Sequence, residues 1–385
     1  MFKEDGVLVP MDEYMNHQMT DTFATVLQSD RSWTEKVCLS VGAKDGSMQI
    51  GFGLGKYLNR NVMDCYAGIS RGVEQWTVRG SRQLFPEPDT YGVGPIHYEV
   101  IEPLKKIRIR LNQNDTQPIA FDVLLDCSEI PPFLEEHEFR RQLGGYRIDN
   151  DLVRYHQTGV PSGWLMIDGV KHTIDADNWY CTRDHSWGVR YGVGDEPTDV
   201  MPGIDSSMFP MNFSWSPMRM IDSDGSTYAI HHFYLKMGIP GVPEICQGGV
   251  EYADGSKQLI DTIDHQLQFN PMNRRLLGGD LILKLQDASQ RTLHLEVVSD
   301  TGFHLGTGLY FGLDGKHHGQ WRGELNIEGE YFSDCASRET AERIHQIRDC
   351  IVKITDGNAV GYSNIQTTVT GEWTDLGLKA NDTFW

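Results

Sequence analysis

Alternation of apolar and polar residues is the commonest pattern along this chain. It is clear at residues 107–111, 283–286, 293–297 and 325–328, where every second side chain is apolar. A period of two is typical of a β-strand with one buried face. Asp-Gly pairs, which accept the positive φ angles of tight hairpin turns, are frequent between such segments. They stand at 45–46, 168–169, 224–225, 254–255, 314–315 and 356–357. We therefore expect consecutive strands to pair antiparallel.

Helical periodicity is rare in comparison. Residues 337–349 predict a helix, because Ser337 can cap its first turn and Ile344, Ile347 and Ile351 fall on one face. A shorter helix is predicted over residues 133–140. Many antiparallel strands with few helices indicate an all-β protein. Sandwiches and closed barrels both fit this pattern, and closure removes the exposed sheet edges along which strands aggregate.

The length of 385 residues predicts two domains, since a single hydrophobic core rarely grows beyond about 250–300 residues. Residues 194–197 and 201–203, which contain glycine and proline, interrupt the strand pattern. We therefore place the boundary near residues 195–205. The expected domains are an N-terminal barrel over residues 1–198 and a C-terminal barrel over residues 199–385. The two halves share no convincing sequence repeat.

The formal net charge of −20 argues against a nucleic-acid partner or an anionic membrane surface, because both are bound through positive protein surfaces. A small apolar or aromatic substrate fits the composition better. The start of the chain has no apolar signal region, and no apolar run is long enough for membrane insertion. We therefore expect a cytoplasmic protein. The sequence does not decide between a monomer and a homodimer. The seven cysteines lack a Cys-x-x-Cys pair, which is typical of reduced thiols.

Several familiar motifs fail on their context. Residues 68–72 match the Gly-x-Ser-x-Gly pattern of serine hydrolases, but a strand-like segment at 73–78 replaces the helix that this motif requires. The glycines of residues 51–56 fit neither a P-loop nor a dinucleotide fingerprint and predict a glycine-bearing strand. The His-His doublets at 231–232 and 317–318 cannot each bind one metal ion as a unit, because adjacent strand residues point to opposite faces. We expect no metal, and no organic cofactor.

Residues 178–194 concentrate ionisable groups among large aromatic side chains. An acid, an imidazole, a hydroxyl and two guanidinium groups are interleaved there with tryptophan and tyrosine. Such a mixture suits an acid–base site, because an apolar setting raises the pKa of a carboxylate and a nearby arginine lowers it. A satisfied hydrogen-bond network at a domain junction would have the same composition. The residues alone leave both interpretations open.

Two parts of this region resemble a known superfamily. The hairpin Gly-Trp-Leu-Met-Ile-Asp-Gly at 163–169 is followed by Arg-Asp-His-Ser-Trp-Gly at 183–188. The pattern is similar to that of the tandem lipocalin-like proteins, which include carotenoid 1,2-hydratases and fungal decalin-forming Diels-Alderases. The resemblance implies two calycin barrels, a ligand cavity at or near their junction, and no metal or organic cofactor. Ser186, between His and Trp, and Arg183, in place of an aromatic residue, depart from the pattern, so the carotenoid substrate is not carried over.

The resemblance also implies a reaction type. In the hydratase branch an acidic residue protonates an alkene and water captures the cation. By position Asp184 becomes the catalytic proton donor and His185 its partner. The remaining candidates are expected to bind the substrate. Arginines would hold an anionic or hydroxyl group, aromatic rings would offer apolar surface, and one histidine would face the cavity. They are Arg183, Arg190, Trp187, Trp215, Tyr234 and His232.

We expect a cofactor-independent lyase that adds or removes water or a small fragment at an apolar isoprenoid or aryl-substituted substrate. Expulsion of formaldehyde or water from the side chain of a phenol is an alternative outcome of the same groups. A pericyclase or isomerase, which needs cavity shape rather than a titrating group, is another. The alternative from a different class is a non-catalytic carrier of apolar ligands. A carrier should tolerate Asp184→Asn, whereas an enzyme should lose turnover and keep much of its binding.

Overall fold

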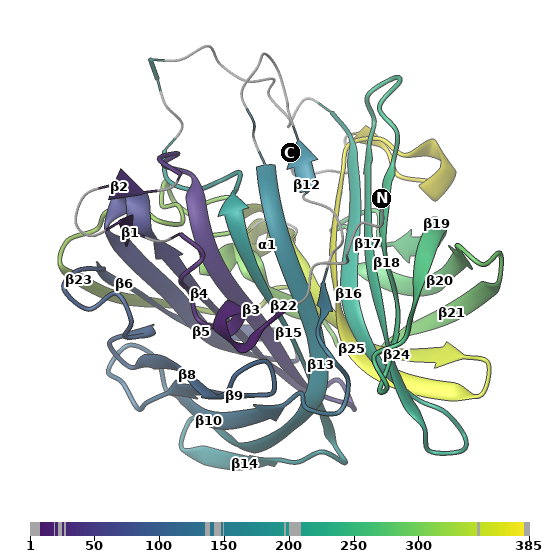
Figure 1. Cartoon of the computed structure of the whole chain (residues 1–385), viewed down its shortest axis with the longest axis horizontal. Helices are drawn as coiled ribbons and strands as arrows, with labels where there is room; N and C mark the ends of the chain where they lie inside the picture. The colour runs from purple at the N-terminus through teal and green to yellow at the C-terminus, as the bar shows by residue number, and fades with distance from the viewer. Residues whose placement is uncertain are drawn as a thin grey trace.

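The strands gather into two barrel-like sheets that stand side by side in Figure 1, one formed by the purple-to-teal part of the chain and one by the green-to-yellow part. The computed structural model describes residues 8–18, 20–21, 25–26, 28–134, 139–141, 148, 150–195, 198–199, 209–344 and 347–380. Within them the expected all-β fold of two lipocalin-like barrels is confirmed.

The first barrel is an antiparallel sheet with a single apolar core on its inner face. Its long strands are β3 (Trp33–Ala43), β4 (Met48–Tyr57), β5 (Val62–Arg71), β6 (Glu74–Gln83), β8 (Ile96–Glu102), β9 (Lys106–Leu111), β10 (Ile119–Asp126), β13 (Asn150–Ile167), β14 (Val170–Ile174) and β15 (Trp179–Val189). Its short elements are η1 (Pro10–Glu13), β1 (Thr20–Asp21), β2 (Thr25–Val26), η2 (Leu58–Arg60), β7 (Gly92–Val93), β11 (Phe133–Leu134) and β12 (Phe139–Arg141). The strand order runs β6-β5-β4-β3-β15-β13-β10-β9-β8-β7, so β15 lies mid-sheet between β3 and β13.

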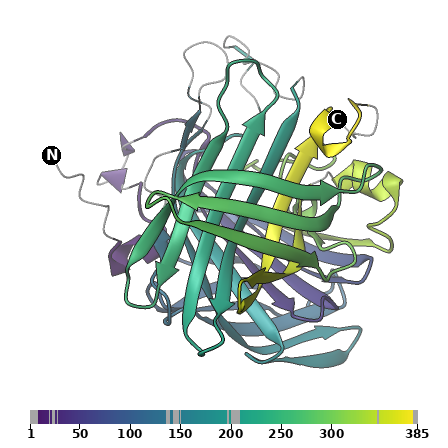
Figure 2. The same ribbon diagram turned by 90° about the vertical axis from the view of Figure 1, so that its right-hand side faces the viewer.

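The second barrel closes on itself. Its strands are β16 (Met211–Ile221), β17 (Thr227–Met237), β18 (Ile245–Tyr252), β19 (Lys257–Phe269), β20 (Leu276–Leu285), β21 (Gln290–Val297), β24 (Arg348–Asp356) and β25 (Ala359–Thr370). Closure comes from the pairing of β21 with β24, and a second apolar core fills the interior. η5 (Thr374–Leu376) follows β25. Figure 2 shows this barrel facing the viewer, with the first behind it. Strands β13 and β15 of the first barrel contact β16 and β25 of the second.

The turn chemistry read from the sequence is confirmed. The Asp-Gly pairs at 45–46, 168–169, 224–225, 254–255 and 356–357 each join two paired strands. Each of these glycines has a positive φ angle, which a residue with a Cβ adopts only with strain. The pair at 314–315 instead closes a turn outside the named strands.

One segment of the second half of the chain completes the first barrel. β22 (Phe303–His304) pairs with β24, η4 (Leu305–Gly308) follows, and β23 (Leu325–Phe332) pairs with β6. The predicted glycine-bearing strand is β4, where a Cβ at Gly51 would collide with the ring of Phe303 from this segment. Residues beyond 198 therefore contribute to the first sheet, and most of the expected boundary at 195–205 lies outside the described residues.

The two helix predictions need correction. The helix over 337–349 is confirmed only for α1 (Arg338–Ile344), because residues from Arg348 onward pair with β25 as strand β24. A short apolar run such as this does not distinguish a buried strand from a helix. The helix predicted over 133–140 is wrong at residues 133–134 and 139–140, because β11 and β12 both pair with β13, and residues 135–138 lie outside the described residues. No helix of the described residues is long and apolar enough to cross a membrane.

Candidate functional site

Strand β15 carries the Asp-His-Ser-Trp-Gly segment and divides its side chains between two compartments. Adjacent residues on a strand point to opposite faces. Arg183, His185 and Trp187 point into the first barrel, on the same face as residues of its apolar core. Asp184 and Ser186 point toward the second barrel. A proton passing directly from Asp184 to His185 would therefore have to cross the sheet.

Inside the first barrel, Arg183 is held by a complete set of partners. Its two Nη atoms donate to the carboxylate oxygens of Glu13 at 2.8 and 2.6 Å, and both side chains are buried. It also donates to the hydroxyls of Tyr98 and Tyr155 and to Oε1 of Gln157. Burial opposes the ionisation of Glu13, but the charge and hydrogen bonds of Arg183 hold the pKa of this carboxyl below its ordinary value. The geometry is that of a satisfied buried ion pair.

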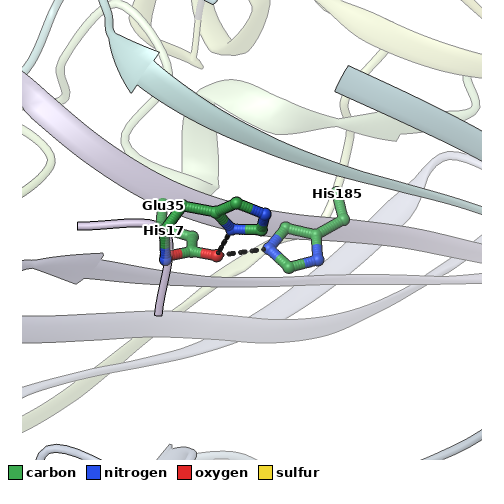
Figure 3. Close-up of side chains that lie close together, drawn as sticks. All are labelled: His17, Glu35 and His185. Atoms are coloured by element: carbon green, nitrogen blue, oxygen red, sulfur yellow. Dashed lines mark hydrogen bonds and ion pairs between the residues drawn. The ribbon is translucent and has the colours of Figure 1, made fainter. Parts of the chain in front are cut away.

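His185 lies in a cluster with Glu35 and His17 on the same inner face (Figure 3). His185 Nε2 is 3.0 Å from Glu35 Oε1, and His17 Nδ1 is 2.6 Å from the same oxygen. Trp187 stacks on the His17 ring, with centroids 3.6 Å apart. Although burial opposes its ionisation, hydrogen bonds from both histidines keep the pKa of Glu35 below its usual range. The donor atoms of these three residues lie within 4.8 Å of one another, so they are able to hold a metal ion.

On the other face of β15, a cavity of about 190 Å³ opens between the two barrels. Its apolar wall comes from β13, β16, β17 and the residue before β24. That wall includes Leu152, Met211, Phe213, Phe233, Leu235 and Ile347. An apolar cavity of about 150 Å³ is enough to bind benzene. The cavity therefore has room for one substituted aromatic ring.

Cationic side chains converge on this cavity. Arg154 and Arg190 both line it, and Nε of Arg154 lies 3.5 Å from Oδ2 of Asp184. Arg190 donates to Oγ of Ser186 at 2.7 Å, while its buried Nε has no hydrogen-bond partner among the described residues. No carboxylate in the described part of the chain lies within ion-pair distance of Arg190. Arg190 is thus a cation on the cavity wall to which no described residue supplies a paired anion.

A histidine of the cavity wall is backed by a buried lysine. His318 lines the cavity, and its Nε2 is 2.9 Å from Nζ of Lys36, which lies 3.9 Å from the centroid of the Tyr310 ring. Burial, together with the charge of Arg190, lowers the pKa of Lys36 to about 7. Burial and the nearby charge of Lys36 lower the pKa of His318 well below its usual value. His318 is therefore a neutral imidazole at neutral pH.

A buried carboxyl group lies beside the same cavity. Asp349 on β24 accepts a hydrogen bond at 3.3 Å from Nε2 of Gln366, which lines the cavity. Burial raises the pKa of Asp349 to about 7, and the charge of Asp184 acts in the same direction. The protonated acid is therefore favoured in the folded protein over a pH range in which the unfolded chain is ionised.

This shift predicts a pH-dependent stability effect for Asp349→Asn. In the unfolded chain the carboxyl ionises near its ordinary value of 3.8, but in the folded protein near 7, so it lowers the stability of the wild type as pH rises between these values. The stability of the variant relative to wild type should rise by up to about 1.4 kcal/mol per pH unit over that window and level off above it. Urea unfolding at a series of pH values measures the difference. A difference independent of pH would contradict the prediction.

The residues predicted to bind substrate are spread over three compartments. Arg190 lines the junction cavity, and Trp215 lies at the junction against His156. His232 and Tyr234 face the interior of the second barrel, where they contact Ser214 and Glu244 respectively. Arg183 and Trp187, as described above, face the interior of the first barrel. Of the predicted catalytic pair, Asp184 reaches the junction cavity through Arg154, and His185 does not face it.

The sequence interpretation missed several residues of the junction. Arg154, His318 and Tyr310 line the cavity, and Lys36 supports two of them. A lysine within the largely apolar segment that forms β3 was a usable signal. The 317–318 doublet was tested only as a chelating unit, although one of its histidines faces the cavity.

One protein-family model matches nearly the whole chain. The model is described as a family of unknown function (DUF8625) and matches residues 8–379. The chain belongs to this family. No curated protein sequence matches it.

Several solved structures are similar to this DUF8625 member, and one of them exceeds a TM-score of 0.5. A protein of Nitrosomonas europaea provisionally described as AttH is similar at a TM-score of 0.51 and 12% identity, covering 87% of this chain and 92% of that one. Kievitone hydratase from Nectria haematococca is similar at a TM-score of 0.45 and 12% identity, and the match covers 93% of this chain and 97% of that one. The structure of CghA with Sch210972 is similar at a TM-score of 0.44 and 9% identity, and the match covers 88% of each chain. At these identities the likeness concerns the fold, and the predicted resemblance to tandem lipocalin-like proteins is confirmed at that level.

Proposed function

We infer that this protein is a cofactor-independent lyase that eliminates or adds water, or a small fragment such as formaldehyde, at a hydroxyaryl substrate in the junction cavity. The observation that carries this inference is Arg190, a cation on the cavity wall for which the described residues supply no paired carboxylate. Arg190 is half-buried and its Nε atom is shielded from solvent. A charge that is partly withdrawn from water without a partner is costly, so such a group is expected where a ligand supplies the opposite charge.

The charge of the cavity favours one of the expected reactions over another. Arg190, Arg154 and the nearby Lys36 would stabilise negative charge that develops on a bound oxygen. The same groups would raise the energy of a carbocation, which alkene protonation generates. An anionic route through a phenolate is therefore favoured over hydration of an isolated alkene.

The wall residues can be assigned roles in such a reaction. His318, as a neutral imidazole, would accept the proton of the phenol, and Arg190 would hold the resulting phenolate. The phenolate electrons then break the bond between the side-chain carbon and its hydroxyl group. The proton held by His318 returns to the departing hydroxide, so that water leaves and the protein is unchanged. Asp184 would position Arg154 through their ion pair.

Two alternatives use the same cavity. A pericyclase would need its shape but not a titrating group, and a carrier would need neither His318 nor a particular protonation state. Both would bind an aryl ligand as well as a lyase would. Stabilisation of a phenolate tests the anionic route before the natural substrate is known, whereas turnover separates the lyase from the two alternatives.

We expect the cavity to lower the pKa of a bound phenol. Umbelliferone is a suitable probe, because its absorption band shifts when its hydroxyl ionises. Its apparent pKa should fall by about one unit or more on binding, since a cation within about 4–6 Å favours the charged form of an acid. Arg190→Gln should abolish most of this shift while binding of the neutral phenol persists. Spectrophotometric pH titration with and without the protein measures both quantities.

A matched control separates this effect from general protein charge. Arg108 forms a partly exposed ion pair with Asp122 on the first barrel, and neither residue lines the cavity. Arg108→Gln removes the same charge and should leave the shift unchanged. Equal shifts in wild type and Arg190→Gln would remove Arg190 from the site and would contradict the proposed anionic route.

A further inference from the structure

The cluster of His17, Glu35 and His185 assembles two imidazole nitrogens and a carboxylate oxygen from three remote parts of the sequence (Figure 3). Glu35 and His185 come from the adjacent strands β3 and β15, and His17 from the segment after η1. All three lie on the side of β15 that faces away from the junction cavity. The proposed lyase reaction does not use them.

The geometry points to a binding site for a divalent transition metal of the Zn²⁺ type, with Nδ1 of His17, Oε1 of Glu35 and Nε2 of His185 as ligands. Imidazole nitrogen with one carboxylate suits zinc and its neighbours, whereas Mg²⁺ and Ca²⁺ prefer sets made only of oxygen. A tetrahedral Zn²⁺ holds its ligand atoms roughly 3.3 Å apart. The two N–O separations of 2.6 and 3.0 Å require small outward movements, and the two ligand nitrogens lie within 4.8 Å of each other.

The outer atoms of the ligands are already fixed in the manner of a metal site. The second ring nitrogen of His17 lies 3.2 Å from Oδ1 of Asp12, and that of His185 lies 3.1 Å from the Tyr155 hydroxyl. Such hydrogen bonds orient metal-bound histidines and select the tautomer whose free nitrogen faces the ion. The other oxygen of Glu35 accepts a hydrogen bond from the backbone N–H of His17 at 3.1 Å, which leaves Oε1 directed at the two rings.

The two buried carboxylates of this barrel have different partners, because Glu35 pairs with the imidazoles of His17 and His185 rather than with an arginine. Glu13 and Glu35 are both buried on this inner face. Glu13 is neutralised by Arg183, but no Lys or Arg of the described residues forms an ion pair with Glu35. Two imidazole nitrogens instead approach one carboxylate oxygen, so in the metal-free cluster two protons must lie between these atoms. A divalent cation at the same point satisfies all three donor atoms at once.

The ligand count defines the kind of site. Three protein ligands leave one position of a tetrahedral Zn²⁺ for water or an added small molecule, as in zinc sites that are not closed by a fourth protein ligand. Because His17 belongs to the segment ahead of β3, a bound metal would also tie that segment to the barrel wall. Trp187, stacked on His17, covers the ligand ring.

Zinc binding to the full-length protein tests this site. The protein is stripped with a chelator and titrated with Zn²⁺ in a calorimeter, and the metal retained after dialysis is counted. We expect one Zn²⁺ per chain and a higher melting temperature with the metal, because an ion that binds only the folded state stabilises it. Mg²⁺ at the same concentration should produce neither effect.

Variants locate the bound metal. His17→Ala should weaken Zn²⁺ binding by at least about tenfold, since loss of even an outer-shell partner costs about 10–100-fold. Glu35→Gln keeps the shape of the side chain and should weaken binding as well. His294→Ala is the matched control, because His294 is an exposed histidine that also contacts a carboxylate, Asp280. The visible absorption of bound Co²⁺ in each folded variant gives a second reading of the same site.

Two results would overturn the inference. One is the absence of bound Zn²⁺ in the wild-type protein, and the other is full retention of Zn²⁺ by His17→Ala and Glu35→Gln. The umbelliferone titration of His17→Ala should match that of wild type, because Arg190 lies in the other compartment. The metal site and the lyase proposal therefore fail independently of each other.

Discussion

Replacing Arg183 with methionine should lower the free energy of unfolding by about 3–5 kcal/mol, because it removes one partner of a buried ion pair. Arg183 and Glu13 are both almost fully buried and are joined by two short hydrogen bonds. Methionine leaves Glu13 with tyrosine hydroxyl and backbone donors but no cation. Chemical unfolding at neutral pH measures the loss.

A double variant and a surface control sharpen this test. Arg183→Met combined with Glu13→Gln removes both charges, so it should recover part of the stability lost in the single variant. Arg108→Met breaks an exposed pair with Asp122 and should cost less than about 1 kcal/mol. A loss as small as that of Arg108→Met in the Arg183 variant would show that the buried pair has little structural importance.

The fold of this chain could be predicted because its signals are local. Alternation in segments such as 107–111 and Asp-Gly pairs such as 168–169 fix strands and turns within a few residues. The errors fell where local pattern is ambiguous. Residues from Arg348 onward are apolar enough for a buried strand or a helix face, and only their pairing with β25 decides between them.

The functional site was harder to predict because it depends on which face of a strand each residue occupies. The density of charge around Asp184 was visible in sequence, but strand alternation sends Arg183 and Asp184 to different compartments. The partners come from far away: Glu13 pairs with Arg183, and Lys36 contacts His318. No spacing rule within a single segment reveals such contacts.

Strands β3 and β15 form a shared wall between the two candidate sites. Glu35 and His185 face the first barrel, and their neighbours Lys36 and Asp184 face the junction. Substitutions in this wall therefore need a readout for each side, since a change in backbone position on one face reaches the other. Variants at His318, which comes from outside these strands, avoid this complication.

His318→Gln is expected to have the largest effect on activity. If His318 moves the proton of a phenol, its loss should lower turnover by about 10²–10⁴-fold while binding changes little. Para-hydroxybenzyl alcohol is a suitable test substrate, because reversible loss of water exchanges its side-chain oxygen with labelled solvent. Mass spectrometry of the recovered alcohol gives the exchange rate, and umbelliferone binding gives the affinity.

Asp184→Asn provides the matched comparison for His318→Gln. Asp184 acts on the cavity through Arg154, so in the proposed mechanism its replacement should slow exchange less than loss of His318 does. Had Asp184 been the proton donor that the sequence resemblance implies, the order of the two effects would be reversed. His294→Gln, on the exposed surface of the second barrel, should leave exchange unchanged. Wild-type protein that binds the alcohol without accelerating its oxygen exchange would contradict the lyase proposal and favour a carrier.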